Sequence, residues 1–194
     1  MTLDTALKNF ASAFVAGSKN IGTVQFRPPQ PITEPIPLGA ILRDYYAKML
    51  LCNRPQVAGA LQLRLWTLDE LEVRQHGFRW ISENGGSVIE DPRWNKHWIV
   101  IADRDGDAIV IDDSTADGAV YGVIGSYSCK ISADLAGFFQ SMAEAILVEV
   151  TTYDYEVYDD DFNPLPNFLN EMSAISRRVL GADGEAGFMK FFFG

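Results

Sequence analysis

The stretch that decides the fold is Trp98-Ile-Val-Ile-Ala-Asp-Arg-Asp-Gly-Asp-Ala-Ile-Val-Ile-Asp112. It contains two apolar runs rich in β-branched residues, a composition typical of strands. Asp105-Gly106 lies between the runs and is a preferred pair for the tight turn of a β-hairpin. Because both runs are apolar on both faces, we expect a hairpin in a sheet that is covered on both sides.

The sequence after this hairpin predicts a third strand and two helices. Ala116-Asp-Gly118 indicates a turn, and residues 119–124 give the next strand of an antiparallel meander. Ser132 is the expected N-cap of a helix, and a later helix should end at Gly181. Their apolar faces are Leu135, Phe138, Phe139, Met142 and Ile146 in the first helix and Phe168, Leu169, Met172, Ile175 and Val179 in the second. The Phe-rich end, from Phe188 onward, is too apolar to remain in water and should dock on the core.

The sequence before the hairpin opens with a helical stripe capped by Thr2, whose apolar positions are Leu3, Leu7, Phe10 and Phe14. Residues 27–37 contain five prolines, so they must be extended. They could be a linker, but a loop that lies on the domain is the preferred interpretation. A helix is expected over residues 38–51 and is broken by Asn53-Arg-Pro55.

Short elements then lead into the hairpin. Alternating leucines at residues 61–65 predict a half-buried strand. Thr67 and Glu70 form a capping box for a helix that runs to about His76, and Gly77 stops it. Asn84-Gly-Gly86 predicts a turn. Together these elements predict an α+β fold with a mainly antiparallel sheet, a meander at its core and helices packed around it.

The charge of the chain limits its partners. The 194 residues carry a net charge of -10, which repels phosphate backbones and anionic membrane surfaces and attracts a basic protein. No apolar run approaches the length of a membrane span, and the first residues lack the charge pattern of a signal peptide. The two cysteines, Cys52 and Cys129, form no metal or redox motif. We therefore expect a cytoplasmic protein with reduced thiols and no partner among nucleic acids or membranes.

The residues that could perform chemistry form no recognised catalytic motif. His76 and His97 are the only histidines, and neither has the spacing of a metal site. A dyad of Cys129 with one of them stays open as a remote hydrolase hypothesis. Asp103, Asp105 and Asp107 alternate around a glycine, as Ca²⁺ ligands do, but the glycine and the twelfth position do not fit an EF-hand loop. A plain hairpin turn is the preferred interpretation, and we expect no catalytic residue, cofactor or metal.

The most promising working surface is the acidic and aromatic stretch Thr151-Thr-Tyr-Asp-Tyr-Glu-Val-Tyr-Asp-Asp-Asp161. Tyrosines are favoured anchors of interfaces, and carboxylates steer a basic partner toward them. A solvated helix end is the alternative. The candidate contact residues are Tyr153, Asp154, Tyr155, Glu156, Tyr158, Asp159, Asp160 and Asp161, with Trp94 as either a core residue or a partly exposed platform.

The order of these parts resembles the SUKH superfamily, which includes fungal cell-wall synthesis regulators of the Smi/Knr type and many bacterial immunity proteins. The matching pieces are Pro35-Ile-Pro-Leu-Gly-Ala-Ile-Leu-Arg-Asp-Tyr-Tyr46, Leu61-Gln-Leu-Arg-Leu-Trp-Thr-Leu-Asp-Glu-Leu71, the hairpin of residues 98–112, Gly118-Ala-Val-Tyr121 and Ile131-Ser-Ala-Asp-Leu-Ala-Gly-Phe-Phe139. One feature departs from the family, because its Asn-Gly-Gly comes soon after the first core helix and here comes later, at residues 84–86.

The resemblance implies a SUKH-like fold without catalysis. It predicts one domain over residues 1–194, with a core at about 35–145. Residues 1–20 and 27–37 form an N-terminal extension, and residues 145–194 form a helical C-terminal one. Bacterial members commonly neutralise a cognate toxin, often a nuclease, and such toxins are basic. The leading hypothesis is an immunity protein that binds a basic toxin domain. The alternative is a regulatory scaffold in cell-wall synthesis or signalling.

Overall fold

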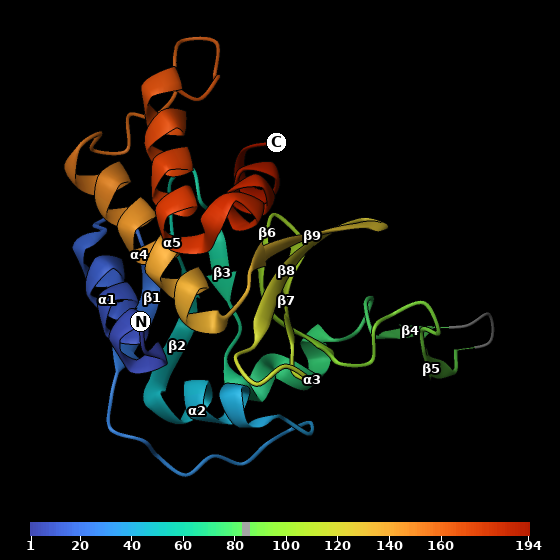
Figure 1. Cartoon of the computed structure of the whole chain (residues 1–194). Coiled ribbons are helices and arrows are strands. Elements are labelled where there is room, and N and C mark those ends of the chain that lie inside the picture. Colours follow the sequence, from blue (N-terminus) through green and yellow to red (C-terminus); the bar gives the residue numbers. More distant parts are fainter. Residues whose placement is uncertain (83–85) are drawn as a thin grey trace.

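The computed structural model describes residues 1–82 and 86–194, and its centre is a sheet of seven strands whose neighbours all pair antiparallel. The strand order is β1-β2-β3-β6-β7-β8-β9, and a separate pair, β4–β5, projects to one side (Figure 1). The strands are β1 Ile21–Phe26, β2 Met49–Gln56, β3 Leu63–Leu65, β4 Trp80–Ser82, β5 Val88–Glu90, β6 Trp98–Arg104, β7 Asp107–Asp112, β8 Ala119–Ile124 and β9 Tyr127–Ser132. The fold is therefore α+β with an antiparallel meander, as the sequence predicts.

Helices pack around this sheet. Helix α4 (Leu135–Thr151) lies between α1 (Leu3–Ala16) and α5 (Pro166–Phe193) (Figure 1). Helix α2 (Ala40–Lys48) contacts β2, and the short η1 (Leu68–Glu70) and α3 (Leu71–Arg74) lead toward β6. One cluster of buried apolar side chains extends from Ala6 in α1 to Phe192 in α5. Segments that are far apart in sequence thus share one core.

The central hairpin confirms the prediction made from residues 98–112. Strands β6 and β7 pair from Trp98–Asp112 to Arg104–Asp107. Asp105 and Gly106 have φ angles of 51° and 93°, the two positive values that a two-residue hairpin turn of this kind requires. The side chains of residues 99–102 and 108–111 are at most 3% exposed. Both faces of the hairpin are therefore covered.

Several other predictions are also confirmed. The Thr2 hydroxyl accepts a hydrogen bond from the Thr5 N–H at 3.3 Å and so caps α1. The Pro-rich loop lies on the core, because Ile36 and Leu38 at its end are buried. Gly181, with a φ of 78°, interrupts α5. The segment after it docks, and Phe188 and Phe192 are fully buried.

The helix predicted over residues 38–51 is wrong at its C-terminal end. Helix α2 ends at Lys48, and β2 begins at Met49. Met49 is buried and stands four residues after the buried Tyr45, so it continues the helical spacing although it belongs to a strand. Asn53 and Arg54 have positive φ angles and stay within β2, where the sequence indicated only a break. The apolar period alone could not distinguish these two states.

Three smaller features also differ from the prediction. The sequence indicated no strand at β1 or β9, because each contains few buried apolar side chains. The N-cap of α4 is Asp134, whose carboxylate accepts from the Gly137 N–H at 2.6 Å, whereas Ser132 closes β9. The helix begun by the capping box ends at Arg74 rather than His76. The turn predicted at Asn84-Gly-Gly86 falls largely outside the described residues.

Candidate protein-binding site

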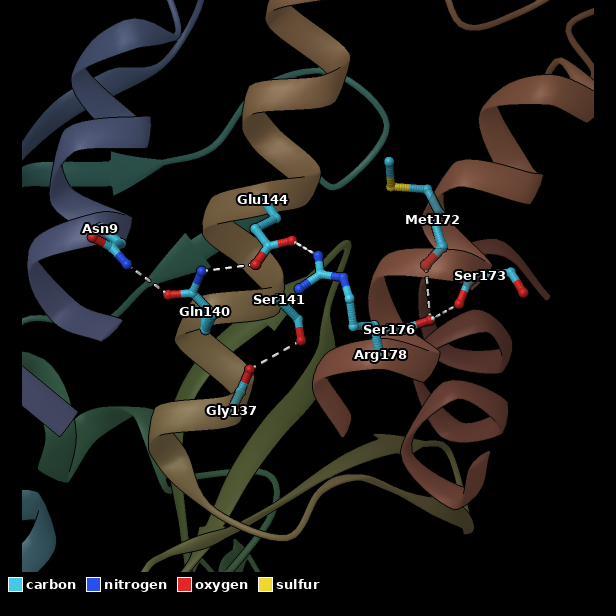
Figure 2. Close-up of polar contacts among 9 residues, drawn as sticks. All are labelled: Asn9, Gly137, Gln140, Ser141, Glu144, Met172, Ser173, Ser176 and Arg178. Carbon is cyan, nitrogen blue, oxygen red and sulfur yellow. Dashed lines mark hydrogen bonds and ion pairs between the residues drawn. The ribbon is translucent and has the colours of Figure 1, made fainter. Parts of the chain in front are cut away.

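Most of the acidic stretch lies in the connection between α4 and α5, which spans residues 152–165. A polar network fixes the helices on either side of this connection (Figure 2). Asn9 of α1 donates its amide to Gln140 Oε1 at 2.8 Å, and Gln140 donates to Glu144 Oε1 at 2.8 Å. The guanidinium of Arg178, on α5, bonds the other oxygen of Glu144. The relay joins α1, α4 and α5, so both ends of the connection start from positions that the core defines.

The first half of the connection is anchored inward. The Tyr153 hydroxyl donates to Glu171 Oε1 on α5 at 2.8 Å. Tyr155 is 9% exposed, and its hydroxyl accepts from the Lys19 N–H at 3.1 Å. The ammonium of Lys19 also lies 4.4 Å from the centre of the Tyr155 ring, and Val157 is fully buried. These side chains hold the connection against α5 and the turn after α1.

Glu149 at the end of α4 is a structural carboxylate rather than a surface one. It is 1% exposed, and its Oε1 accepts from the Ala60 N–H at 2.7 Å. Burial raises the pKa of Glu149, an effect that the Ala60 hydrogen bond and the charge of Lys19 only partly oppose. The Tyr155 N–H donates to the Glu149 carbonyl at 3.1 Å. Glu149 therefore ties the residue 57–62 loop to the start of the connection.

The second half of the connection is a tight turn that faces solvent. Asp159 Oδ1 accepts from the N–H groups of Asp161 and Asn163, at 3.0 and 2.8 Å. Phe162 has a φ of 61° and is 86% exposed, although it is apolar. Five exposed residues lie in this turn or just before it in the chain, and we call them the acidic tip: Glu156, Tyr158, Asp160, Asp161 and Phe162. The tip combines an apolar anchor with three carboxylates on a backbone that is held by hydrogen bonds.

The structure separates the residues that the sequence grouped. Tyr153 is half-buried and Tyr155 is buried, so both support the connection from within. Asp154 is exposed beside them, with a φ of 47°. Asp160 and Asp161 are exposed in the turn that Asp159 forms, and Glu156 and Tyr158 are exposed on the segment that leads into it. Burial raises the pKa of Tyr158, which is 41% exposed.

Trp94 does not belong to this surface. It lies in the loop between β5 and β6, at the far end of the molecule from the connection between α4 and α5 (Figure 1). Its indole N–H donates to the Trp98 carbonyl at 3.2 Å, and its ring contacts Phe78 and Trp98. Trp94 is half-buried and stabilises an aromatic cluster there.

The aspartates of the central hairpin form the tight turn described above. Asp103 is 8% exposed, and its Oδ1 accepts from the Gly106 N–H at 3.4 Å. Burial raises the pKa of Asp103, because desolvation outweighs this bond and the charge of Arg64. Within residues 1–82 and 86–194, there is no group of three or more His, Cys, Asp or Glu side chains that could hold a metal ion.

The thiol of Cys129 is engaged with the backbone rather than with a histidine. It is 9% exposed, and its Sγ lies 3.7 Å from the Gly187 carbonyl, to which it donates. Burial raises the pKa of Cys129 and so disfavours the thiolate. The ring of His76 packs against Trp80, and the backbone N–H of His97 bonds Asn95. The Cys–His dyad considered from the sequence is not formed.

Sequence reasoning missed Phe162 as a surface residue. An isolated phenylalanine between an aspartate run and a proline gives no periodicity, so its side chain had no assigned direction. The sequence feature that could have predicted its exposure is Asp161-Phe-Asn-Pro164. Asp, Asn and Pro favour a turn, and a turn here exposes the Phe162 side chain to solvent.

Comparison with descriptions of known protein families, with curated proteins and with solved structures finds no match in any of the three. The resemblance to the SUKH superfamily therefore stays a prediction. In the part of the chain that the structure describes, every helix is too short or too polar to cross a bilayer.

Proposed function

We propose that this chain is a non-catalytic protein-binding module that holds a basic partner with its acidic tip. The observation that carries the proposal is Phe162, a large apolar side chain that is 86% exposed on a turn fixed by Asp159. Aromatic residues that are exposed in the free protein and become buried at the centre of an interface commonly supply much of its binding energy. Because the turn is already ordered, binding costs little conformational entropy.

Charge supports a basic partner. Residues 131–176 contain nine acidic residues and no Lys or Arg. Glu156, Asp160 and Asp161 are exposed, and their carboxylates form no hydrogen bond or ion pair with the rest of the described chain. Free carboxylates raise the rate of encounter with a positively charged surface, whereas Phe162 would slow dissociation.

The finer proposal is a toxin-neutralising immunity protein. Its support is the resemblance in the order of sequence elements and the acidic character of the chain, because enzymes that act on nucleic acids present basic surfaces. An acidic tip whose turn is held by hydrogen bonds can cover the basic surface of such an enzyme and exclude the nucleic-acid substrate. A regulatory scaffold would use the same chemistry on another partner, and the neighbouring genes distinguish the two: a toxin gene beside this one favours immunity.

The test is binding of the full chain to the purified, catalytically inactivated protein encoded by the adjoining gene, measured by interferometry at 50 and 300 mM salt. We expect the Kd to rise at least about tenfold at the higher salt, because exposed charges are screened. Phe162→Ala should raise the Kd by about 10- to 100-fold, the effect of removing an interface anchor.

The matched control removes the same number of negative charges from exposed residues outside the tip. Glu156→Gln with Asp160→Asn and Asp161→Asn should slow association. Glu72→Gln with Asp117→Asn and Asp183→Asn, at residues that are also exposed, should not. The proposal fails if neither the tip variants nor Phe162→Ala alters the complex, or if no basic protein binds even at low salt.

A further inference from the structure

The two edge strands of the seven-stranded sheet, β9 and β1, differ in how they are protected from pairing with another chain. At one edge, β9 includes Lys130 and is covered by the C-terminal part of α5, where Gly187 approaches so closely that a Cβ would lie 1.9 Å from the Lys130 carbonyl. At the other edge, β1 has the sequence Ile21-Gly-Thr-Val-Gln-Phe26, without charge or proline. Proteins normally protect an edge with charge, proline, a covering element or a bulge. Strand β1 has only an irregularity in register between Ile21 and Thr23, and residues 23–26 pair with β2 in regular register.

The backbone of β1 presents hydrogen-bonding groups to this open side. The Arg27 N–H donates to the Lys48 carbonyl at 2.8 Å, which fixes the hydrogen-bonded pairs between β1 and β2. Because such pairs alternate along an antiparallel ladder, Gln25 and Thr23 also face β2, and the N–H and C=O groups of Val24 and Phe26 point away from it. No other element of the described chain bonds them. An added strand would find partners there.

A groove runs beside this edge, between β1 and α1. Its volume is about 590 Å³, and its lining includes Val15 of α1 and Val24 and Phe26 of β1. Val15 is 76% exposed, and Ile21, at the start of β1, is 59% exposed. Apolar side chains beside open backbone groups are the requirements of strand addition, in which the backbone supplies affinity and alternate side chains enter the groove.

The charge of the groove indicates the partner. Lys8 lines it, and its Nζ lies 5.1 Å from the centre of the Phe26 ring. The lining contains no acidic residue, in a chain whose net charge is -10. A second copy would bring another lysine and a strongly negative body to the same place, so self-pairing is disfavoured. An acidic side chain at the Phe26 end would instead pair with Lys8.

We propose that β1 accepts an extended segment of another protein as an eighth, antiparallel strand, with apolar side chains toward α1 and an acidic residue near its N-terminal end beside Lys8. This surface is separate from the acidic tip, so the inference goes beyond the proposed function. In that pairing, two residues of the added segment lie directly opposite Val24 and Phe26 and form backbone hydrogen bonds with them. The side chains of these two residues face α1.

The test uses the full ¹⁵N-labelled chain and the peptide acetyl-Glu-Thr-Val-Thr-Val-Thr-amide. We expect amide shifts concentrated at β1 and along the groove face of α1. Methylating the two valine nitrogens should raise the Kd at least about tenfold, because two backbone hydrogen bonds are lost. Methylating two threonine nitrogens is the matched control, since those groups would face away from β1, and it should leave the Kd within about twofold.

The acidic position is tested separately. Replacing the peptide glutamate by glutamine, or Lys8→Glu in the chain, should raise the Kd about threefold, as expected for an exposed ion pair. Equal losses for both methylated peptides, shifts away from β1, or sedimentation as a dimer that excludes the peptide would overturn the proposal.

Discussion

Glu149 and the carboxylates of the acidic tip come from one block of sequence, residues 131–176, which contains no Lys or Arg, and the fold uses them in opposite ways. Glu149 is 1% exposed and bonds the Ala60 N–H, whereas Asp160 and Asp161 project from a turn into solvent. Burial raises the pKa of Glu149. The acidic residues of this block therefore do not form one surface. Glu149 holds the connection between α4 and α5 in place, whereas the tip carboxylates are free to contact a partner.

The largest effect should come from crowding the buried carboxylate. Gly59 has a φ of 72°, and a Cβ there would lie 2.0 Å from Glu149 Oε1. Gly59→Ala should lower the free energy of unfolding by about 3 kcal/mol, because it adds backbone strain and displaces Glu149 from Ala60. Urea denaturation followed by circular dichroism measures this loss.

Gly106→Ala is the matched control for backbone strain alone. Gly106 has a φ of 93°, and a Cβ there would meet no atom within 4 Å. We expect a loss of about 1 kcal/mol. Equal losses in the two variants would mean that contact with Glu149 contributes nothing.

Removal of the carboxylate itself should have the next largest effect. Glu149→Ala leaves the buried Ala60 N–H without an acceptor, which should cost about 2 kcal/mol in the free energy of unfolding. Exchange of the Ala60 amide proton should accelerate in parallel. Unchanged stability and exchange would show that this hydrogen bond does not hold the loop of residues 57–62.

How far the sequence predicted this molecule depends on how local each signal was. The central hairpin could be predicted, because its two apolar runs and its turn pair lie within fifteen residues. Strand β1 could not, because of its six residues only Val24 is buried and Gly22 interrupts the alternation. Met49 misled the prediction of α2, since one residue satisfied both the helical and the strand period.

The candidate site was located by sequence but not resolved. The acidic stretch identified the connection between α4 and α5, yet the buried role of Glu149 depends on Ala60, 89 positions away. Tyr155 is likewise buried against Lys19, 136 positions away. Phe162 is exposed because of the turn that Asp159 forms. Composition shows where charge concentrates, whereas the division into supporting and free side chains is set by contacts distant in sequence.

A smaller effect should separate the charge of Glu149 from its hydrogen bond. Glu149→Gln keeps an acceptor for Ala60 and removes the buried charge. The folded chain takes up a proton at Glu149 at higher pH than the unfolded chain, so wild-type stability falls as pH rises from about 4.3 through the raised pKa. The variant should be the more stable at pH 8, and the gap should close toward pH 4.3. Urea titrations at pH 4.5, 6 and 8 measure it, and a gap that widens on acidification contradicts the assignment.

The smallest effects should fall within the acidic tip, where two adjacent aspartates are predicted to differ. Asp159→Ala removes the acceptor of the Asp161 and Asn163 N–H groups and should cost about 1 kcal/mol. Asp160→Ala removes an exposed carboxylate that bonds nothing in the described chain, so the free energy of unfolding should change by less than about 0.5 kcal/mol. Thermal and urea unfolding of the two variants side by side measure the difference. If Asp160→Ala destabilised the chain as much as Asp159→Ala, the tip carboxylates would be structural, and the contrast with Glu149 that leaves them free for a partner would no longer hold.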